Sequence, residues 1–299
     1  MITFAGISGR SSSEVRGIQI SNHIGGSFFD VDSSSFTHGD KFHSNVLFVR
    51  VYRKDLARQI KDLSSGETKI GFDVIDRPVA DLHKIQRHHP LMSEMDWSTL
   101  VDNLIDYYIV NNKASEKMLK KYILPHQKIY VIPHHVAPNE VWEEREVKER
   151  VETVGYIGIK DQLTAKDSIS NFCKERGINF VCEHPSTRQQ CIDLLSEIDV
   201  GIVYLENSLR NDYVIKYKPN TKLSNFQCAG IPSVITEYES FKEFGGNSYL
   251  PGNTRDEFFK NLSMLIEDRD MRVKISKKGF KVSKNLLLSN VSKAYQEIL

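Results

Sequence analysis

The feature that most constrains the fold is a regular alternation, along the whole chain, between short apolar runs and amphipathic stretches. This alternation is typical of a parallel sheet whose faces are covered by helices. The expected strands lie at 2–7, 27–31, 46–51, 69–75, 107–110 and 128–132, and then at 153–159, 178–182, 199–204, 232–236 and 248–250. The sequence therefore predicts the α/β class.

The alternation stops once, at the polar and highly charged stretch 137–151, which we interpret as a connection between domains. A chain of 299 residues suits two domains of about 140 residues each. We expect a first domain at 1–136 and a second at 137–285. Open α/β sheets bind ligands beyond the carboxyl ends of their strands, so two such sheets are expected to form a cleft between them.

The composition excludes several classes of protein. The formal net charge of +1 argues against nucleic acid as a partner, because nucleic-acid-binding proteins carry a strong basic excess. No apolar run approaches the ~20 residues of a membrane span, and the N-terminus lacks the basic start of a signal peptide. The four cysteines form no CxxC pair and are expected to be structural or neutral thiols. These patterns favour a cytoplasmic protein.

The most informative segment is 216–236, which begins Lys-Tyr-Lys-Pro-Asn-Thr-Lys. Pro219 suits the first turn of a helix, and Gly230 suits the residue just past its end. Lys218 and Lys222 are four residues apart, so they are expected on one face of the helix start. Free backbone N–H groups and the positive end of the helix dipole point to the same place. The pattern predicts a cradle for a diphosphate; the alternative is a solvated lysine pair on an ordinary helix.

This segment resembles the donor-binding segment of GT-B glycosyltransferases, the broad family often called glycosyl transferases group 1. Its end, Cys-Ala-Gly-Ile-Pro-Ser-Val-Ile at 228–235, is similar to the end of the family's helix and the strand after it. The start resembles a Lys-Pro-x-Asn-Lys subgroup, matched with one residue of offset by Lys218, Pro219, Asn220 and Lys222. Tyr217 and Asn225 stand where many members have paired glutamates, so the roles of those glutamates are not carried over.

Three further segments resemble the family. The strand and loop at 154–160 are similar to the start of the donor domain, where Gly158 allows close backbone approach and Lys160 reaches a phosphate. Gly9, Arg10 and Arg16 match the loop after the first strand, which faces the acceptor and the donor phosphates. The segment 131–136 matches a turn before the hinge. The last helix, at about 286–299, lies where such folds cross back to the first domain.

The resemblance implies two Rossmann-like domains facing across a cleft. It also implies transfer of a sugar from a nucleotide-sugar donor to a glycan, a lipid-linked compound or another hydroxyl acceptor. No metal or other cofactor is implied, retention of configuration is favoured, and bacterial-type surface-glycan or related glycoconjugate synthesis is the expected setting. The alternatives are a nucleotide-sugar 2-epimerase of similar fold and a non-catalytic nucleotide-sugar-binding protein.

Further candidates follow from strand ends. Asp76 and His134 each follow a strand and are candidates to orient or deprotonate an acceptor hydroxyl; the alternatives are a helix cap and a turn residue. Glu206 and Glu237 follow two strands of the second domain and are candidates to hold the donor nucleotide. The sequence Asp-Val-Asp at 30–32 spells a metal-binding DxD, but it lacks the context of the fold that uses it.

Lysines recur at 274, 277, 278, 281 and 284. The simpler interpretation is a solvated helix face. The alternative is a surface that docks on an anionic membrane to reach a lipid-linked acceptor, with the protein peripheral to the inner face of that membrane.

Overall fold

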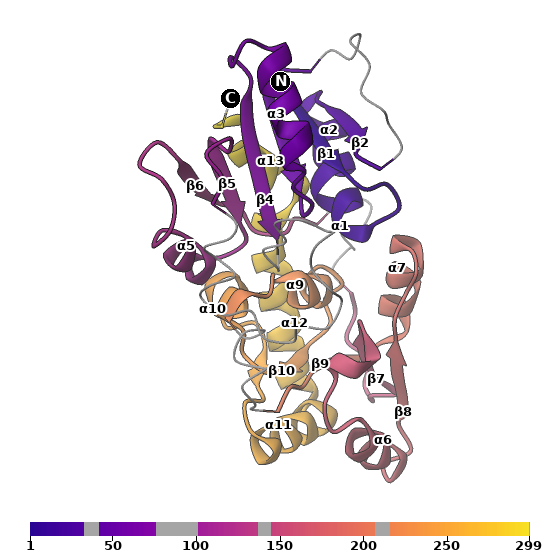
Figure 1. The fold of residues 1–299 in the computed structure, drawn as a ribbon. Coiled ribbons are helices and arrows are strands. Elements are labelled where there is room, and N and C mark those ends of the chain that lie inside the picture. The colour runs from indigo at the N-terminus through magenta and orange to yellow at the C-terminus, as the bar shows by residue number, and fades with distance from the viewer. Residues whose placement is uncertain (33–41, 76–100, 137–144, 207–215, 299) are drawn as a thin grey trace. The chain divides into compact units, whose positions relative to one another are not determined.

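The computed structural model describes residues 1–32, 42–75, 101–136, 145–206 and 216–298 (Figure 1). Asp76 lies outside these ranges. The chain divides into two compact units. Unit 1 comprises Met1–His134, Lys216–Pro219 and Leu288–Leu299, and unit 2 comprises His135–Ile215 and Asn220–Leu287.

Unit 1 contains a six-stranded sheet in the order β2-β1-β3-β4-β5-β6, and every pair is parallel. The strands are β1 (Ile2–Gly6), β2 (Ser27–Asp30), β3 (Asn45–Val49), β4 (Lys69–Ile75), β5 (Tyr107–Val110) and β6 (Lys128–Val131). β1, β3 and β5 are buried at every residue, as expected for parallel strands covered on both faces.

The described helices of unit 1 are α1 (Ser11–Ser13), the π-helical turn η1 (Glu14–Ile18), α2 (Gln19–Ile24), α3 (Lys54–Leu63), α5 (Lys113–Leu119) and α13 (Leu288–Gln296). Figure 1 shows α13, the yellow C-terminal helix, beside this sheet. Val291 and Tyr295 of α13 belong to the same buried cluster as Phe4 and Ile109 of the sheet. The end of the chain is therefore part of the core of unit 1.

Unit 2 contains a five-stranded sheet in the order β11-β10-β9-β7-β8, and every described pair is parallel. Its strands are β7 (Thr153–Ile157), β8 (Asn179–Glu183), β9 (Val200–Val203), β10 (Ser233–Ile235) and β11 (Leu250–Pro251). In both sheets the first strand lies between the second and the third. The predicted α/β class with parallel sheets is confirmed.

The described helices of unit 2 are η3 (Lys160–Gln162), α6 (Lys166–Lys174), α7 (Arg188–Glu197), α9 (Thr221–Cys228), α10 (Glu239–Gly245), α11 (Arg255–Glu267), α12 (Arg269–Ser283) and η4 (Lys284–Leu286). Thr187 and Gln190 form the capping box of α7. No helix among the described ranges is both long enough and apolar enough to cross a bilayer.

Candidate functional site

The carboxyl edge of the sheet in unit 2 brings together several of the predicted donor-binding residues. Gly158 and Lys160 follow β7, Glu206 comes shortly after β9, and Glu237 comes shortly after β10. β7 lies between β8 and β9, so the chain changes direction across the sheet at this point. In open parallel sheets a ligand crevice forms outside the carboxyl ends of the strands at such a switch point.

Gly158 and Lys222 are in close contact at this edge. The φ angle of Gly158 is +151°, a conformation open essentially to glycine alone. A Cβ added to Gly158 would lie 2.8 Å from Cε of Lys222 and 3.0 Å from the Oη of Tyr156. The stem of Lys222 therefore passes over the bare backbone of the loop after β7, and this closeness depends on a glycine.

The ammonium group of Lys222 lies near Tyr156 and Gln162. Its Nζ lies 5.7 Å from the centroid of the Tyr156 ring and 3.5 Å from Oε1 of Gln162. The Oη of Tyr156 donates a hydrogen bond to the carbonyl of Ile159 at 3.0 Å, which holds the ring in place. Burial raises the pKa of Tyr156, so the phenol stays neutral at physiological pH. Lys222 also lies in the first turn of α9, where backbone N–H groups favour an anion.

Lys160 forms an ion pair with Glu183 at the end of β8, with 3.0 Å between Nζ and Oε2. About half of each side chain is exposed (46% and 51%). Exposed pairs of this kind contribute little to stability. Lys160 can therefore exchange Glu183 for an anionic ligand at small cost.

Glu237 is held by three hydrogen bonds. Its carboxylate accepts from the Oη of Tyr249 at 3.1 Å and from the Nδ2 of Asn253 at 3.0 Å, and its backbone N–H donates to Oδ1 of Asn253 at 3.0 Å. Burial, and then the charge of Glu237, raise the pKa of Tyr249, so that phenol remains a donor. Glu206 is exposed, and its backbone N–H donates to Oγ1 of Thr164 at 2.8 Å. Glu237 is thus a preorganised acceptor, whereas Glu206 is a surface carboxylate.

The expected pairing of Lys218 with Lys222 on one helix face is wrong. α9 begins at Thr221, and the buried Asn220 is its N-cap. Pro219 therefore lies before the helix instead of in its first turn, and a residue that precedes proline is disfavoured from the helical conformation. Lys218 belongs to unit 1. The other end of the helix follows the prediction, because Gly230 has a left-handed φ of 63° just past the last turn.

In unit 1, the loop after β1 carries Gly9 and the exposed Arg10. Gly9 has a left-handed φ of 75° and open space around its Cα. The loop is fixed by hydrogen bonds from the N–H of Ser8 to Oδ2 of Asp30 (3.2 Å) and from the N–H of Ile7 to Oγ of Ser13 (3.1 Å). Ser13 thus ties the loop to the helix, and no side chain caps α1. Gly9 and Arg10 occupy the carboxyl end of a central strand.

The first aspartate of the Asp-Val-Asp motif supports this loop. Asp30 accepts from the N–H of Ser8 through Oδ2 and from the N–H of Asp32 through Oδ1 at 2.9 Å. Within the described ranges, no group of three or more His, Cys, Asp or Glu residues is arranged to hold a metal ion.

Arg16 was expected to face a phosphate or the acceptor, and this expectation is wrong. Its side chain is fully buried and makes an ion pair with the fully buried Asp73, with 2.8 Å to Oδ2 from both Nε and Nη2. Its Nη1 donates to the carbonyls of Ile132 (3.0 Å) and Pro133 (2.8 Å). Burial alone would lower the pKa of Arg16, but Asp73 and Tyr295 outweigh it and raise the pKa. Arg16 is a structural cation that joins the first helix to two strand ends.

Two other strand ends of unit 1 contain a residue with an unusual backbone conformation. Arg50 after β3 and Ile75 at the end of β4 have left-handed φ angles of 64° and 55°. For a β-branched residue such as Ile75 this conformation is costly, and such strain concentrates at functional sites. Ile75 directly precedes Asp76. His134, the second candidate base, is buried just after β6.

Several residues at the edge of unit 2 were not predicted. Arg188, at the start of α7, donates from Nη2 to Oδ1 of Asn225 at 2.9 Å and so connects α7 to α9. Tyr156 and Gln162 surround the ammonium group of Lys222. Tyr156 lies inside the recognised 154–160 segment, but nothing in the pattern indicated which way its ring points. Arg188 was visible only as part of a helix start.

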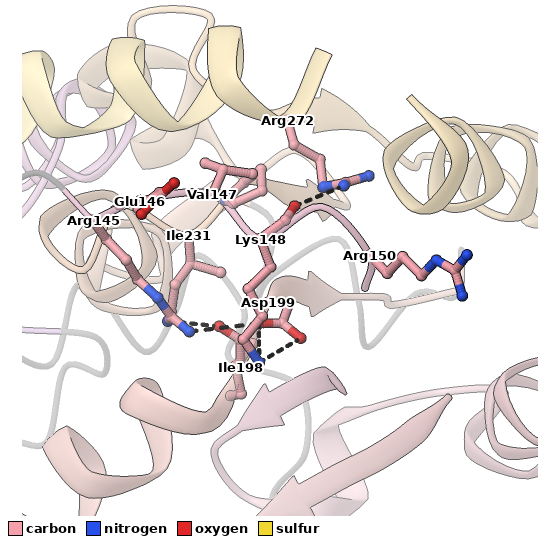
Figure 2. Close-up of a pocket in the computed structure, with 11 residues that line it drawn as sticks. Arg145, Glu146, Val147, Lys148, Arg150, Ile198, Asp199, Ile231 and Arg272 are labelled. Carbon is pink, nitrogen blue, oxygen red and sulfur yellow. Dashed lines mark hydrogen bonds and ion pairs between the residues drawn. The ribbon is translucent and has the colours of Figure 1, made fainter. Parts of the chain in front are cut away.

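A pocket lies at the opposite edge of the same sheet, where β9 and β10 begin. It is lined by residues of the segment 145–150, by residues that precede the two strands and by one residue of α12, namely Arg145, Glu146, Val147, Lys148, Arg150, Ile198, Asp199, Gly230, Ile231, Pro232 and Arg272. Figure 2 shows Arg145 and Lys148 turned toward Asp199, and Arg272 turned toward the backbone at Lys148. These charged groups anchor the segment 145–150 within unit 2. Because ligands of open parallel sheets bind at the carboxyl edge, this pocket is not the candidate donor site.

Comparison with solved structures defines the fold. The chain is similar to HepE from Anabaena, solved with UDP and glucose, with a TM-score of 0.61 and 11% identity over 99% of this chain and 98% of that chain. It is also similar to sucrose-phosphate synthase from Thermosynechococcus elongatus (TM-score 0.59, 9% identity, 100% and 98% covered). A third similar structure is WaaG, a glycosyltransferase involved in lipopolysaccharide biosynthesis, with a TM-score of 0.58 and 10% identity over 100% of this chain and 99% of that chain.

The protein therefore has the GT-B fold, with two Rossmann-like α/β domains, and the resemblance found in the sequence is confirmed at the level of the fold. No protein-family model matches the chain, and no curated protein matches it by sequence.

Proposed function

We propose that this protein is a glycosyltransferase that moves a sugar from a nucleotide-sugar donor to an acceptor hydroxyl. The observation that carries the proposal is the contact between Gly158 and Lys222 at the carboxyl edge of unit 2. It puts an ammonium group beside a loop residue that has no side chain and in the first turn of a helix. HepE, which has the same fold, binds UDP and glucose.

The chemistry follows from the charge that builds up when the sugar leaves. Departure of a nucleoside diphosphate concentrates negative charge on the phosphate oxygens. Lys222 and the free N–H groups of α9 are preorganised to stabilise that charge, and they do so without a metal ion. Lys160 and Lys218 are further cations for the diphosphate, and Glu237 is oriented to accept hydrogen bonds from ribose hydroxyls.

The acceptor side is assigned to unit 1. The loop with Gly9 and Arg10 lies at the carboxyl end of β1 and is open to solvent at Arg10. Asp76 and His134 remain the candidate bases, and transfer with retention of configuration remains the favoured outcome. A glycan or a lipid-linked hydroxyl compound is the proposed acceptor, in cytoplasmic glycoconjugate synthesis.

The direct test is nucleotide binding. UDP, supplied at about 100 times its dissociation constant, should stabilise the chain by about 2.7 kcal/mol and raise its melting temperature, whereas uridine without phosphates should give little shift. A panel of nucleoside diphosphates and nucleotide sugars identifies the base and the sugar. If no nucleotide in the panel shifts the melting temperature, the donor assignment fails.

Product analysis then separates the enzyme classes. A transferase consumes the nucleotide sugar only when an acceptor is present, apart from slow hydrolysis. A nucleotide-sugar 2-epimerase converts the donor alone, which NMR of the sugar protons detects. A non-catalytic binding protein shows the melting shift with neither reaction.

A peripheral membrane contact is the second part of the proposal. On α12 the lysines at 274, 277, 278 and 281 are all exposed and repeat at helical spacing, and the exposed Lys284 follows in η4. Such a face suits anionic lipid headgroups, each lysine near the surface contributing about 1 kcal/mol. Co-sedimentation with phosphatidylglycerol vesicles should be strong at low salt and lost in Lys277→Glu/Lys281→Glu. Equal binding to neutral phosphatidylcholine vesicles would contradict the assignment.

A further inference from the structure

The segment Lys216–Pro219, here called the strap, belongs to unit 1, although the residues on both sides of it in the chain belong to unit 2. Tyr217 of the strap is buried. The strap carries Lys218, and the peptide bond after Pro219 joins it directly to Asn220, the N-cap of α9. Whatever holds the strap therefore also holds the backbone of Lys218.

Two neighbouring asparagines at the carboxyl end of β5 hold the strap. Nδ2 of Asn111 donates to the carbonyl of Tyr217 at 3.1 Å, and Nδ2 of Asn112 donates to the carbonyl of Lys216 at 3.1 Å. Both asparagines are fully buried. Buried donors of this kind are costly to leave unpaired, so the two amides strongly favour a docked strap.

Asn111 also connects the strap to the strained end of β4. Its Nδ2 donates to the carbonyl of Ile75, the left-handed residue that directly precedes Asp76. One amide group thus bonds both the strap and the backbone that leads to a candidate base. The hydrogen bonds of Asn111 are not needed to start α5, because the cap of that helix is made by Asn112 alone.

We infer that Asn111 and Asn112 are positioning residues, which dock the strap on β5 and thereby hold Lys218 for the donor diphosphate. The part of this inference that concerns the donor rests on the proposed function. The docking itself does not.

Substitutions of Asn112 can separate the docking of the strap from the folding of α5. Its Oδ1 caps α5 by accepting from the N–H of Ser115 at 2.8 Å, while its Nδ2 serves the strap. Asp and Ser are both good N-cap residues, but neither has an amide donor. Asn112→Asp and Asn112→Ser therefore keep the cap and lose the strap bond, whereas Asn112→Ala loses both.

Limited trypsin digestion measures directly whether the strap is docked. Cleavage after Lys216 should become about three- to tenfold faster in all three variants, which corresponds to the loss of one buried hydrogen bond. Cleavage after Lys117, inside α5, should stay unchanged in Asn112→Asp and Asn112→Ser and should rise only in Asn112→Ala. If the Lys216 site is no faster in the first two variants, the docking assignment is overturned, whatever the function of the protein.

The second readout is the UDP-induced melting shift of the same variants. The inference expects a weaker affinity for UDP, by about three- to tenfold, in Asn112→Asp and Asn112→Ser, with the ligand-free melting temperature lowered less than in Asn112→Ala, which also loses the cap. Faster cleavage together with an unchanged UDP affinity would overturn the positioning role and leave the proposed function intact. Absence of any UDP shift in the wild-type chain would overturn the donor role of the strap together with the proposed function.

Discussion

Replacement of Lys222 by Met should lower kcat/KM for sugar transfer by about 10²–10³-fold, the usual effect of removing one group that stabilises developing negative charge. The ligand-free melting temperature should change little, because methionine keeps the apolar stem that lies over Gly158. The measurement is steady-state transfer from the nucleotide sugar identified by the melting panel. It is sensitive to the one ammonium group that the structure puts at the start of α9.

Three further variants serve as comparisons for Lys222→Met. Lys174→Met removes an exposed lysine from α6 in the same unit and should leave transfer unchanged. Lys222→Arg keeps the charge and should restore part of the activity. Gly158→Ala adds a Cβ 2.8 Å from the Lys222 stem at a strained φ, so it should lose activity while Lys222 is still present. Transfer by Lys222→Met within twofold of wild type would remove the basis of the proposed mechanism.

Replacement of Arg16 by Met should destabilise the chain by about 3–5 kcal/mol, because it leaves the Asp73 carboxylate buried without its partner. The carbonyls of Ile132 and Pro133 lose their donor at the same time. Urea denaturation followed by circular dichroism measures the change, and the affected transition is that of unit 1. UDP affinity of the remaining folded protein should be close to that of wild type.

An exposed ion pair in the same unit provides the matched control. Arg53 pairs with Asp55 at the same 2.8 Å distance, but with side chains 28% and 60% exposed, so Arg53→Met should cost less than about 1 kcal/mol. The double variant Arg16→Met/Asp73→Asn should be less destabilised than the sum of the single variants, since no uncompensated charge remains. A loss below 1 kcal/mol for Arg16→Met would contradict the structural role assigned to this arginine.

The helices and strands of this fold were predictable because they depend on which residues are neighbours in the sequence. Parallel strands buried on both faces appear as continuous apolar runs, and the ten principal runs recur as strands of the two sheets, as does the short run near 248–250. Gly230 was predicted just past the end of a helix and has a left-handed φ there, and Gly158 was indicated by the resemblance.

Side-chain roles that depend on distant partners were not predictable. Arg16 looked like a phosphate ligand until Asp73, 57 positions away in the chain, was found beside it. Lys218 looked like the helical neighbour of Lys222, but the proline between them moves the helix start to Thr221. The pairing of Asn112 with Lys216 spans 104 positions and leaves no local pattern.

By itself, the sequence determined the α/β class and the parallel strands, which follow from hydrophobic periodicity and backbone preference acting over a few residues. The motif at 216–236 added the resemblance to GT-B glycosyltransferases. Only the tertiary structure decided which cations are buried in ion pairs, which one lies at the start of α9, and which segment of the second half belongs to unit 1. Those outcomes depend on contacts between residues far apart in the chain, and the chain order does not encode them locally.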